Sequence, residues 1–160
     1  MLLSIINRLS SIFLLLFCIF FACKDVKPNA LGKKIILICE TENGAKTFEL
    51  SSDVTELDLY DAGITHLSTT IGQLKNLTAV NLKGNQLANL PIEITELENL
   101  ETLSLSSNLL TSLPNEINRL KNLKNLSLDR GNFSNAEQIK IVSLLPHCNI
   151  NFESDDEDGD

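Results

Sequence analysis

The chain contains four cysteines and two histidines. Cysteine can carry a lipid or form a disulfide, and both residue types can bind a metal ion. Cys23 has the most informative surroundings, because it follows an uninterrupted apolar run from Ile12 to Ala22. A helix that crosses a membrane needs roughly 20 apolar residues, whereas the apolar segment of a secretory signal peptide needs about 7–15. The length of this run therefore predicts a signal peptide that occupies residues 1–22.

The junction Phe20-Phe21-Ala22-Cys23 resembles the signal of bacterial lipoproteins, in which a small residue precedes a cysteine. In that family the chain is cut before the cysteine and the cysteine is acylated, so the resemblance implies a palmitate-type lipid on Cys23. Each buried CH₂ group contributes about 0.8 kcal/mol to membrane binding, so several acyl chains hold a protein stably at a membrane surface. We expect a membrane-anchored lipoprotein of the cell envelope, in the outer membrane or exposed at the cell surface.

Two other interpretations of this segment stay open. A secretory signal that is cut elsewhere gives a secreted protein, and an uncleaved anchor uses an apolar stretch that reaches back to Leu2. Residues 23–33 are largely polar and contain Pro28 and Gly32, a composition typical of a tether between an anchor and a folded domain.

The remaining candidates for chemistry do not predict an active site. His66 is expected in a solvated turn, and His147 adjoins Cys148, but two ligands do not make a metal site. Residues 154–160 loosely resemble the start of an EF-hand but lack the bidentate glutamate that such a loop requires. Residues 153–160 predict an acidic disordered tail, and weak, diffuse cation binding is the alternative. The sequence shows no Ser/His/Asp grouping, glycine-rich phosphate loop or paired-carboxylate cleft. We therefore expect no metal, no cofactor, no small-molecule substrate and no enzyme activity.

Charge and composition narrow the class of partner. The formal net charge is −8, and residues 151–160 contain six of the 21 acidic residues. A protein that binds nucleic acid needs a basic face, so we expect no nucleic-acid partner. Aromatic residues make up only 5% of the chain and tryptophan is absent, so leucine and isoleucine must supply most of the core. This composition favours many thin, similar layers over one core built around large rings.

The elements that position these residues follow a repeat of 23 residues. Between residues 54 and 128, aliphatic residues recur at fixed offsets without insertion or deletion. In the second and third copies these positions are Leu77 and Leu100, Val80 and Leu103, Leu82 and Leu105, Leu87 and Leu110, Leu90 and Leu113, Ile94 and Ile117, and Leu97 and Leu120. With Asn85 and Asn108, and with Pro91 and Pro114, this pattern resembles the leucine-rich-repeat family in its 23-residue bacterial form.

Each part of the repeat predicts a local structure. The alternating leucines are typical of a strand with one buried face, and strands that recur every 23 residues must stack in parallel about 4.8 Å apart. Asn85 and Asn108 lie where the chain leaves the strand, and we expect them to satisfy backbone groups there. Pro91 and Pro114 begin a return segment whose apolar spacing suits a short 3₁₀ or α turn. The predicted fold class is α/β: a short solenoid with a curved parallel β-sheet on the concave side and 3₁₀ or α turns on the convex side.

The residues that close each repeat and the ends of the array carry further expectations. We expect a left-handed backbone at the closing asparagines Asn76, Asn99 and Asn122. The strand-exit asparagine is replaced by Ala62 in the first repeat and by Gly131 in the fourth, as expected of atypical terminal units.

So short an array needs a cap at each end. Two strands around a turn at Asn43-Gly44 predict an N-terminal hairpin. Ser134 begins a helical pattern in which Ile139, Val142 and Leu145 share a face, and residues 149–152 follow as a final edge strand. The predicted divisions are 1–22 signal peptide, 23–33 lipid anchor and tether, 34–53 N-terminal cap, 54–133 four leucine-rich repeats, 134–152 C-terminal helix–strand cap and 153–160 acidic tail.

The repeats also bear on the remaining cysteines. Cys39 lies in the N-terminal cap and Cys148 in the C-terminal cap, so four stacked strands place them roughly 20 Å apart. A disulfide needs Cα atoms within about 7 Å, and we therefore expect no bond between these two residues. Both are expected to be small buried hydrophobic residues.

Residues between the inward-pointing leucines are predicted to form columns on the concave face, where a protein partner can bind. Hot spots favour tyrosine and arginine, which singles out Tyr60 and Arg130. The other interpretation is a solvated face, with the partner at an edge or on the convex side. The predicted partner-binding residues are Glu56, Asp58, Tyr60, Asp61, Asn81, Lys83, Thr102, Ser104, Ser106, Asn125, Ser127, Asp129 and Arg130.

Taken together, these patterns predict a membrane-tethered protein-binding module. The resemblance implies a ligand that is a host or envelope protein. The alternative is a structural envelope protein whose repeats self-associate without a dedicated foreign ligand.

Overall fold

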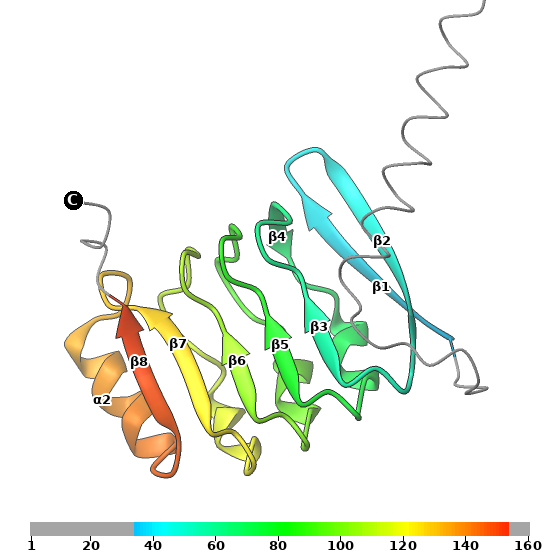
Figure 1. Cartoon of the computed structure of the whole chain (residues 1–160). Helices are drawn as coiled ribbons and strands as arrows, with labels where there is room; N and C mark the ends of the chain where they lie inside the picture. Colours follow the sequence, from blue (N-terminus) through cyan, green and yellow to red (C-terminus); the bar gives the residue numbers. More distant parts are fainter. Residues whose placement is uncertain (1–33, 154–160) are drawn as a thin grey trace, which may run out of the picture.

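Parallel strands stacked side by side form the body of the protein (Figure 1). The computed structural model describes residues 34–153, so the predicted signal peptide, the lipid anchor and tether, and residues 154–160 of the predicted tail lie outside the described part. The elements are β1 (Lys34–Thr41), β2 (Gly44–Ser51), β3 (Glu56–Asp58), β4 (Ile64–His66), η1 (Thr69–Gln73), β5 (Ala79–Asn81), η2 (Ile92–Glu96), β6 (Thr102–Ser104), η3 (Asn115–Arg119), β7 (Asn125–Asp129), α2 (Asn135–Leu144) and β8 (Asn149–Glu153), where η marks a 3₁₀ helix.

The predicted parallel sheet is confirmed: five strands run in the order β3-β5-β6-β7-β8. Its register places residues 23 apart directly opposite each other from β3 to β7. One buried row contains Leu57, Val80, Leu103 and Leu126, and it continues to Ile150 in β8. Each leucine therefore packs against its equivalents in the neighbouring repeats, and burying one such side chain contributes about 1.5–3 kcal/mol.

The return segments form short 3₁₀ helices that lie on one side of the sheet (Figure 1). Pro91 precedes η2 and Pro114 precedes η3, since the fixed φ of proline suits the start of a helix. In the first repeat Ser68 takes this position, and its hydroxyl accepts a hydrogen bond from the backbone N–H of Thr70. Ile94 and Ile117 point from these helices into the core and are fully buried.

Two buried asparagines join successive repeats where the chain leaves the strands. The Asn108 side-chain oxygen accepts a hydrogen bond from the N–H of Leu87 (3.0 Å), and its NH₂ group donates to the carbonyls of Leu82 and Leu105 (both 2.9 Å). Asn85 forms the same three types of bond one repeat earlier. Backbone groups at a buried bend have no strand partner, so these amides replace the missing hydrogen bonds.

The fourth repeat bonds the backbone of the preceding turn with different residues and at different positions. Gly131 occupies the asparagine offset and has no side chain to contribute. Instead, the carboxylate of Asp129 accepts hydrogen bonds from the N–H groups of Ser107 (2.7 Å) and Asn108 (3.1 Å). The side chain of Asn132 donates to the carbonyl of Asn108 at 2.7 Å. The bend is therefore bonded although its consensus asparagine is missing.

The prediction of left-handed backbone at the closing asparagines is wrong. Asn76, Asn99 and Asn122 instead use their side chains, each donating to a backbone carbonyl of the preceding repeat at 2.8–3.0 Å. Within the repeats, left-handed backbone occurs at the strand exit, where Asp61, Gly84 and Ser107 have φ values of 48°, 75° and 58°, and at Gly63 (69°). Glycine adopts this conformation at little cost, whereas another residue loses about 1–2 kcal/mol.

At the N-terminal end, β1 and β2 form an antiparallel hairpin that packs on the core through Ile35, Leu37 and Cys39. Thr41 pairs with Gly44, so the two loop residues are Glu42 and Asn43, one position earlier than the predicted Asn43-Gly44 turn.

The hairpin does more than cover the first repeat, because β1 also pairs with β4 in an unpredicted three-stranded sheet. His66, expected in a turn, lies in β4. Its Nδ1 atom is 3.2 Å from the carboxylate of Glu40 in β1, and both side chains are exposed.

At the C-terminal end, Ser134 caps α2 by accepting a hydrogen bond from the N–H of Glu137. The predicted apolar face is wrong in part. Ile141 and Leu145 are buried against the core, but Ile139 is 71% exposed and Val142 is 51% exposed. Residues four apart share a helix face, so the pair Ile141–Leu145 directs the helix onto the core and turns Ile139 away from it.

Cys39 and Cys148, the two cysteines among the described residues, carry free thiols. Cys39 is buried and Cys148 is half-buried, and burial raises the pKa of both thiols. No helix within residues 34–153 is both long and apolar enough to cross a membrane.

The buried asparagines generate a stability prediction. Asn108→Ala leaves the buried N–H of Leu87 and the buried carbonyl of Leu105 without a side-chain partner, whereas the Leu82 carbonyl keeps its bond from Asn85. We therefore expect a loss of about 3 kcal/mol in the free energy of unfolding, measured in urea. Asn122→Ala is the matched control, because this exposed asparagine makes one hydrogen bond to the carbonyl of Glu98, and its loss should cost about 1 kcal/mol or less. Equal losses in the two variants would contradict the proposed role of burial.

Candidate functional site

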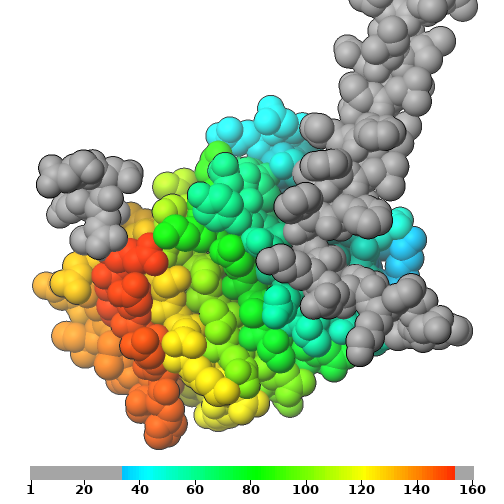
Figure 2. Space-filling model, in the orientation of Figure 1, coloured from blue at the N-terminus to red at the C-terminus, as the bar shows by residue number. Residues whose placement is uncertain are grey.

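The face of the five-stranded sheet that lies opposite the buried leucines is the candidate site, and we call it the open sheet face. Its residues form columns in the predicted register, and β8 extends both columns by one residue that the sequence interpretation did not include. One column contains Glu56, Ala79, Thr102, Asn125 and Asn149, and the next contains Asp58, Asn81, Ser104, Ser127 and Asn151. Figure 2 shows these strands side by side, from β3 in green to β8 in red at the left.

Tyr60 is the exposed aromatic residue of this face. It lies two residues after the end of β3, and 60% of its surface is accessible. A hydrogen bond from its backbone N–H to the carboxylate of Asp58 (3.1 Å) holds this turn, and Asn81 donates to the same carboxylate oxygen at 3.0 Å. Gly84 lies beside the ring, because a Cβ atom there would be 3.4 Å from Cε2 of Tyr60. Tyr60 is therefore fixed at its base while its ring stays accessible.

Three carboxylates belong to β3 and the turn that follows it, as Tyr60 does. Glu56, Asp58 and Asp61 are all exposed, and none of them forms an ion pair within the described residues. The part of the open sheet face formed by β3 therefore combines an accessible ring with uncompensated negative charge.

An ion pair crosses the open sheet face between β5 and β8. Nζ of Lys83, just after β5, lies 3.0 Å from a carboxylate oxygen of Glu153 at the end of β8, so the pair spans β6 and β7. The hydrogen bond and the charge of Glu153 raise the pKa of Lys83. Both side chains remain partly exposed, at 41% and 34%, so solvent weakens the pair and its contribution to stability is small.

Two predicted contact residues are buried where this ion pair crosses the sheet, and their assignment to an accessible surface is wrong. Ser106 has no accessible surface and Asp129 has 8%. They belong to a third column of the face, which contains Tyr60, Lys83, Ser106, Asp129 and Glu153, so the ion pair passes across their strands. Asp129 is also held by the backbone of Ser107, whereas the hydroxyl of Ser106 has no hydrogen-bond partner in the described residues.

The other predicted contact residues remain accessible to different degrees. Arg130 and Asn125 are exposed, and the Arg130 backbone N–H donates to the carbonyl of Glu153 at 2.8 Å. The half-buried members are Asn81, Lys83, Thr102, Ser104 and Ser127. The structure therefore brings the predicted residues onto one face but leaves Tyr60 and Arg130 at separate places on it.

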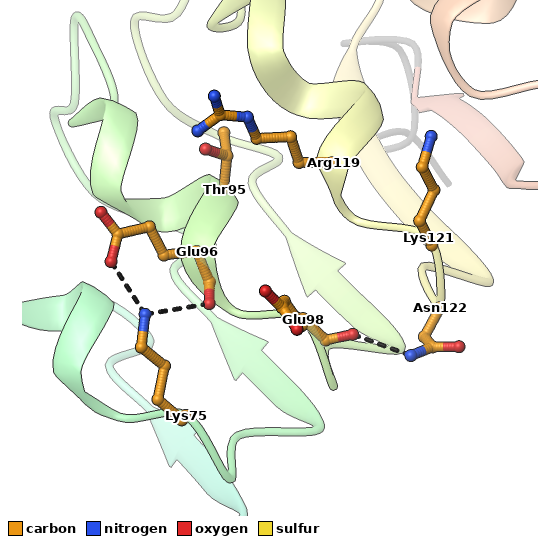
Figure 3. Close-up of a pocket in the computed structure, with 7 residues that line it drawn as sticks. All are labelled: Lys75, Thr95, Glu96, Glu98, Arg119, Lys121 and Asn122. Carbon is orange, nitrogen blue, oxygen red and sulfur yellow. Dashed lines mark hydrogen bonds and ion pairs between the residues drawn. The ribbon is translucent and has the colours of Figure 1, made fainter.

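A groove of about 600 Å³ lies at the ends of η2 and η3 and the loops that follow the 3₁₀ helices (Figure 3). Its lining residues are Lys75, Thr95, Glu96, Glu98, Arg119, Lys121 and Asn122. Lys75 bonds Glu96 at 2.8 Å, which lowers the pKa of that carboxyl, and Asn122 donates to the backbone carbonyl of Glu98. In Figure 3 the cationic side chains do not converge on one point. These contacts join successive repeats, and they do not form the convergent constellation that catalysis needs.

No group of three His, Cys, Asp or Glu residues within residues 34–153 is arranged to hold a metal ion. His147 is exposed beside the half-buried Cys148, and His66 contacts Glu40 at the other end of the molecule. The described geometry therefore offers a polar contact surface and shows no reaction centre.

The Lys83–Glu153 ion pair leads to a test by chemical labelling. We expect Ser106→Cys to react slowly with a soluble thiol reagent while the pair is intact, and about tenfold faster when Glu153→Gln is added, because the pair crosses this position. Ser104→Cys, half-exposed in the neighbouring column, is the control and should react equally in both backgrounds. Labelling is followed by mass spectrometry of the peptide concerned, and an unchanged rate at position 106 would show that the pair does not restrict access.

Comparison of the sequence with protein-family models and with curated proteins gives no match. Among solved structures, a leucine-rich-repeat protein of Leptospira interrogans is similar, with 47% sequence identity and a TM-score of 0.60 over 62% of this chain and 26% of that one. An internalin of Listeria monocytogenes is similar in fold, with 21% identity and a TM-score of 0.50 over 65% of this chain and 29% of that one. The chain thus spans less than a third of either protein. With its stacked parallel strands and 3₁₀ return segments, this chain has the leucine-rich-repeat fold.

Proposed function

We propose that this protein is a membrane-tethered lipoprotein that binds another protein through the open sheet face. Leucine-rich-repeat solenoids offer extended surfaces for protein binding, and the comparisons support such a role in general. The partner is a host or envelope protein, and the protein lies in the cell envelope, anchored at the outer membrane or the cell surface.

The accessible ring of Tyr60 on an otherwise polar face is the observation that carries this proposal. Aromatic residues are enriched at binding hot spots because they bury a large area with little loss of side-chain freedom. The chain contains one tyrosine and no tryptophan, and this tyrosine is exposed on the sheet rather than packed in the core. Because Lys83 and Glu153 restrict the centre of the face, contact begins at β3 and β5.

The acidic residues near Tyr60 indicate the charge of the partner's surface. Glu56, Asp58 and Asp61 make the surroundings of Tyr60 negative, while the nearby cation Lys83 is already paired with Glu153. A partner that presents lysine or arginine side chains complements this surface, and a cation over the ring adds about 0.5–1 kcal/mol at an exposed site.

The anchor proposal rests on the sequence around Cys23, which lies outside the described residues. Radioactive palmitate fed to intact cells should label the natural protein and not Cys23→Ala, because that thiol is the proposed acylation site. Cys18→Ala removes a cysteine within the predicted signal peptide and should keep its label. Equal label in the Cys23→Ala variant and the natural protein would remove the lipoprotein proposal.

The binding proposal is tested by capture of partner proteins from envelope or host-surface fractions. Tyr60→Ala should reduce capture at least tenfold because it removes the exposed ring, and Arg130→Ala should reduce it less, because Arg130 lies at the far side of the face. Ile92→Ala is a suitable control, since Ile92 is 48% exposed on a 3₁₀ helix away from the sheet. Undiminished capture by Tyr60→Ala would place the contact elsewhere, and loss with Ile92→Ala would place it on the helical side.

A further inference from the structure

The two ends of the solenoid are finished in different ways. At the N-terminal end, the β1–β2 hairpin covers the core with Ile35 and Leu37. At the C-terminal end, β8 is the last strand of the sheet and pairs only with β7 within the residues that the structure describes. Figure 2 shows β8 (red) and α2 (orange) at the left end of the molecule. Terminal units of a solenoid normally present a polar outer face, so this end requires an explanation.

The backbone of β8 is oriented to bond one more strand. In the earlier repeats the leucine at the end of each strand donates its N–H to the next strand, as Leu59 does to Asn81, Leu82 to Ser104 and Leu105 to Ser127 (2.8–3.0 Å). Phe152 occupies this offset in β8, opposite Leu128 of β7, and Ile150 lies two residues earlier. Alternate residues of a parallel strand bond to the same side, so the N–H and C=O groups of Ile150 and Phe152 point away from β7.

Apolar side chains accompany this open edge. Ile150 and Phe152 pack on the core but are only partly buried. On α2, Lys140 faces the groove of the preceding repeats, which contains Ser112 and Pro114. Each helical residue turns by about 100°, so Val142 lies on the opposite flank of the helix, toward the open end. Val142 is 51% exposed, so the last layer leaves apolar surface on the helix as well as on the strand.

We infer that a second copy of this chain covers this end, with the two β8 strands antiparallel about a two-fold axis at Asn151. The sequence Asn149-Ile150-Asn151-Phe152-Glu153 is self-complementary in this register. Ile150 of each copy faces Phe152 of the other on the core side. The backbone N–H and C=O groups of these two residues point away from β7 and would form the hydrogen bonds between the copies. Asn151 faces its own equivalent, and Asn149 faces Glu153 of the other copy, so no like charges meet. The exposed flank of α2 extends the contact.

This contact continues the strand-to-strand stacking that already forms the molecule, and an isologous two-fold interface closes without further growth. It is independent of the proposed binding function, because β8 pairing uses the sheet edge and leaves Tyr60 accessible. The two ideas can therefore fail separately.

Cysteine cross-linking tests the register directly. In this register Asn151 and its equivalent form a non-hydrogen-bonded pair of the antiparallel strands. The Cα atoms of such a pair are about 4.5 Å apart, which is within the range for a disulfide. The full chain with Asn151→Cys should form a disulfide-linked dimer on mild oxidation. Asn125→Cys, which is also exposed but lies on the interior strand β7, is the matched control and should stay monomeric. Cys148→Ala is included in both samples to remove the neighbouring thiol.

Sedimentation of the full chain in detergent gives a second readout, with the same N-terminal residues in every sample. We expect a monomer–dimer equilibrium, and Asn151→Lys should raise the dimer dissociation constant at least tenfold, because two lysines then meet at the axis. Val142→Glu should weaken the dimer as well, whereas Asn125→Lys should not. All of these substituted sites are exposed, so circular dichroism should show unchanged folding.

Three outcomes would overturn the inference. The first is a chain that is monomeric at all concentrations. The second is a dimer that cross-links equally well in the Asn125→Cys and Asn151→Cys variants, because the contact would then have no fixed register at β8. The third is a dimer whose dissociation constant is unaffected by Asn151→Lys.

Discussion

Every repeat in this protein buries its leucines against the repeats on either side, and no repeat has a core of its own. Leu103 of β6, for example, lies between Val80 and Leu126 of the flanking strands. This dependence fixes the 23-residue spacing, since an extra residue would move one row of leucines out of register with the next. It also means that the first and last layers bury their leucines fully only where another element covers them. The two ends therefore need contacts that the repeat pattern does not supply.

The buried asparagines make the stacking compatible with the bends of the chain. A leucine row alone leaves backbone groups unpaired at each strand exit, and Asn85 and Asn108 bond those groups from within the core. In the fourth repeat, where Gly131 has no side chain, Asp129 and Asn132 instead bond backbone groups of Ser107 and Asn108 in the preceding turn. The buried carboxylate of Asp129 is thereby a structural residue of the last turn.

Local periodicity made the interior of the repeats predictable, including the parallel sheet and its columns of facing residues. The exceptions have contacts that no repeat offset encodes. The buried Ser106 lies in the column that is crossed by an ion pair between residues 70 positions apart, and β8, which supplies Glu153, belongs to the irregular end of the chain. Likewise, the pairing of β1 with β4 joins a hairpin to a repeat through two register positions separated by an irregularity. On α2, Ile139, Val142 and Leu145 fit one helical spacing, but only Leu145 of these packs on the core, together with Ile141.

The position of the single tyrosine has a spectroscopic consequence. Without tryptophan, the intrinsic ultraviolet emission of this chain comes almost entirely from Tyr60, whose ring is largely in water in the folded protein. Unfolding in urea changes the surroundings of such a ring little, so its emission is a weak reporter of the folded state. The emission of Tyr60 is instead a selective probe of the sheet surface, because a molecule that binds there displaces the water around the ring.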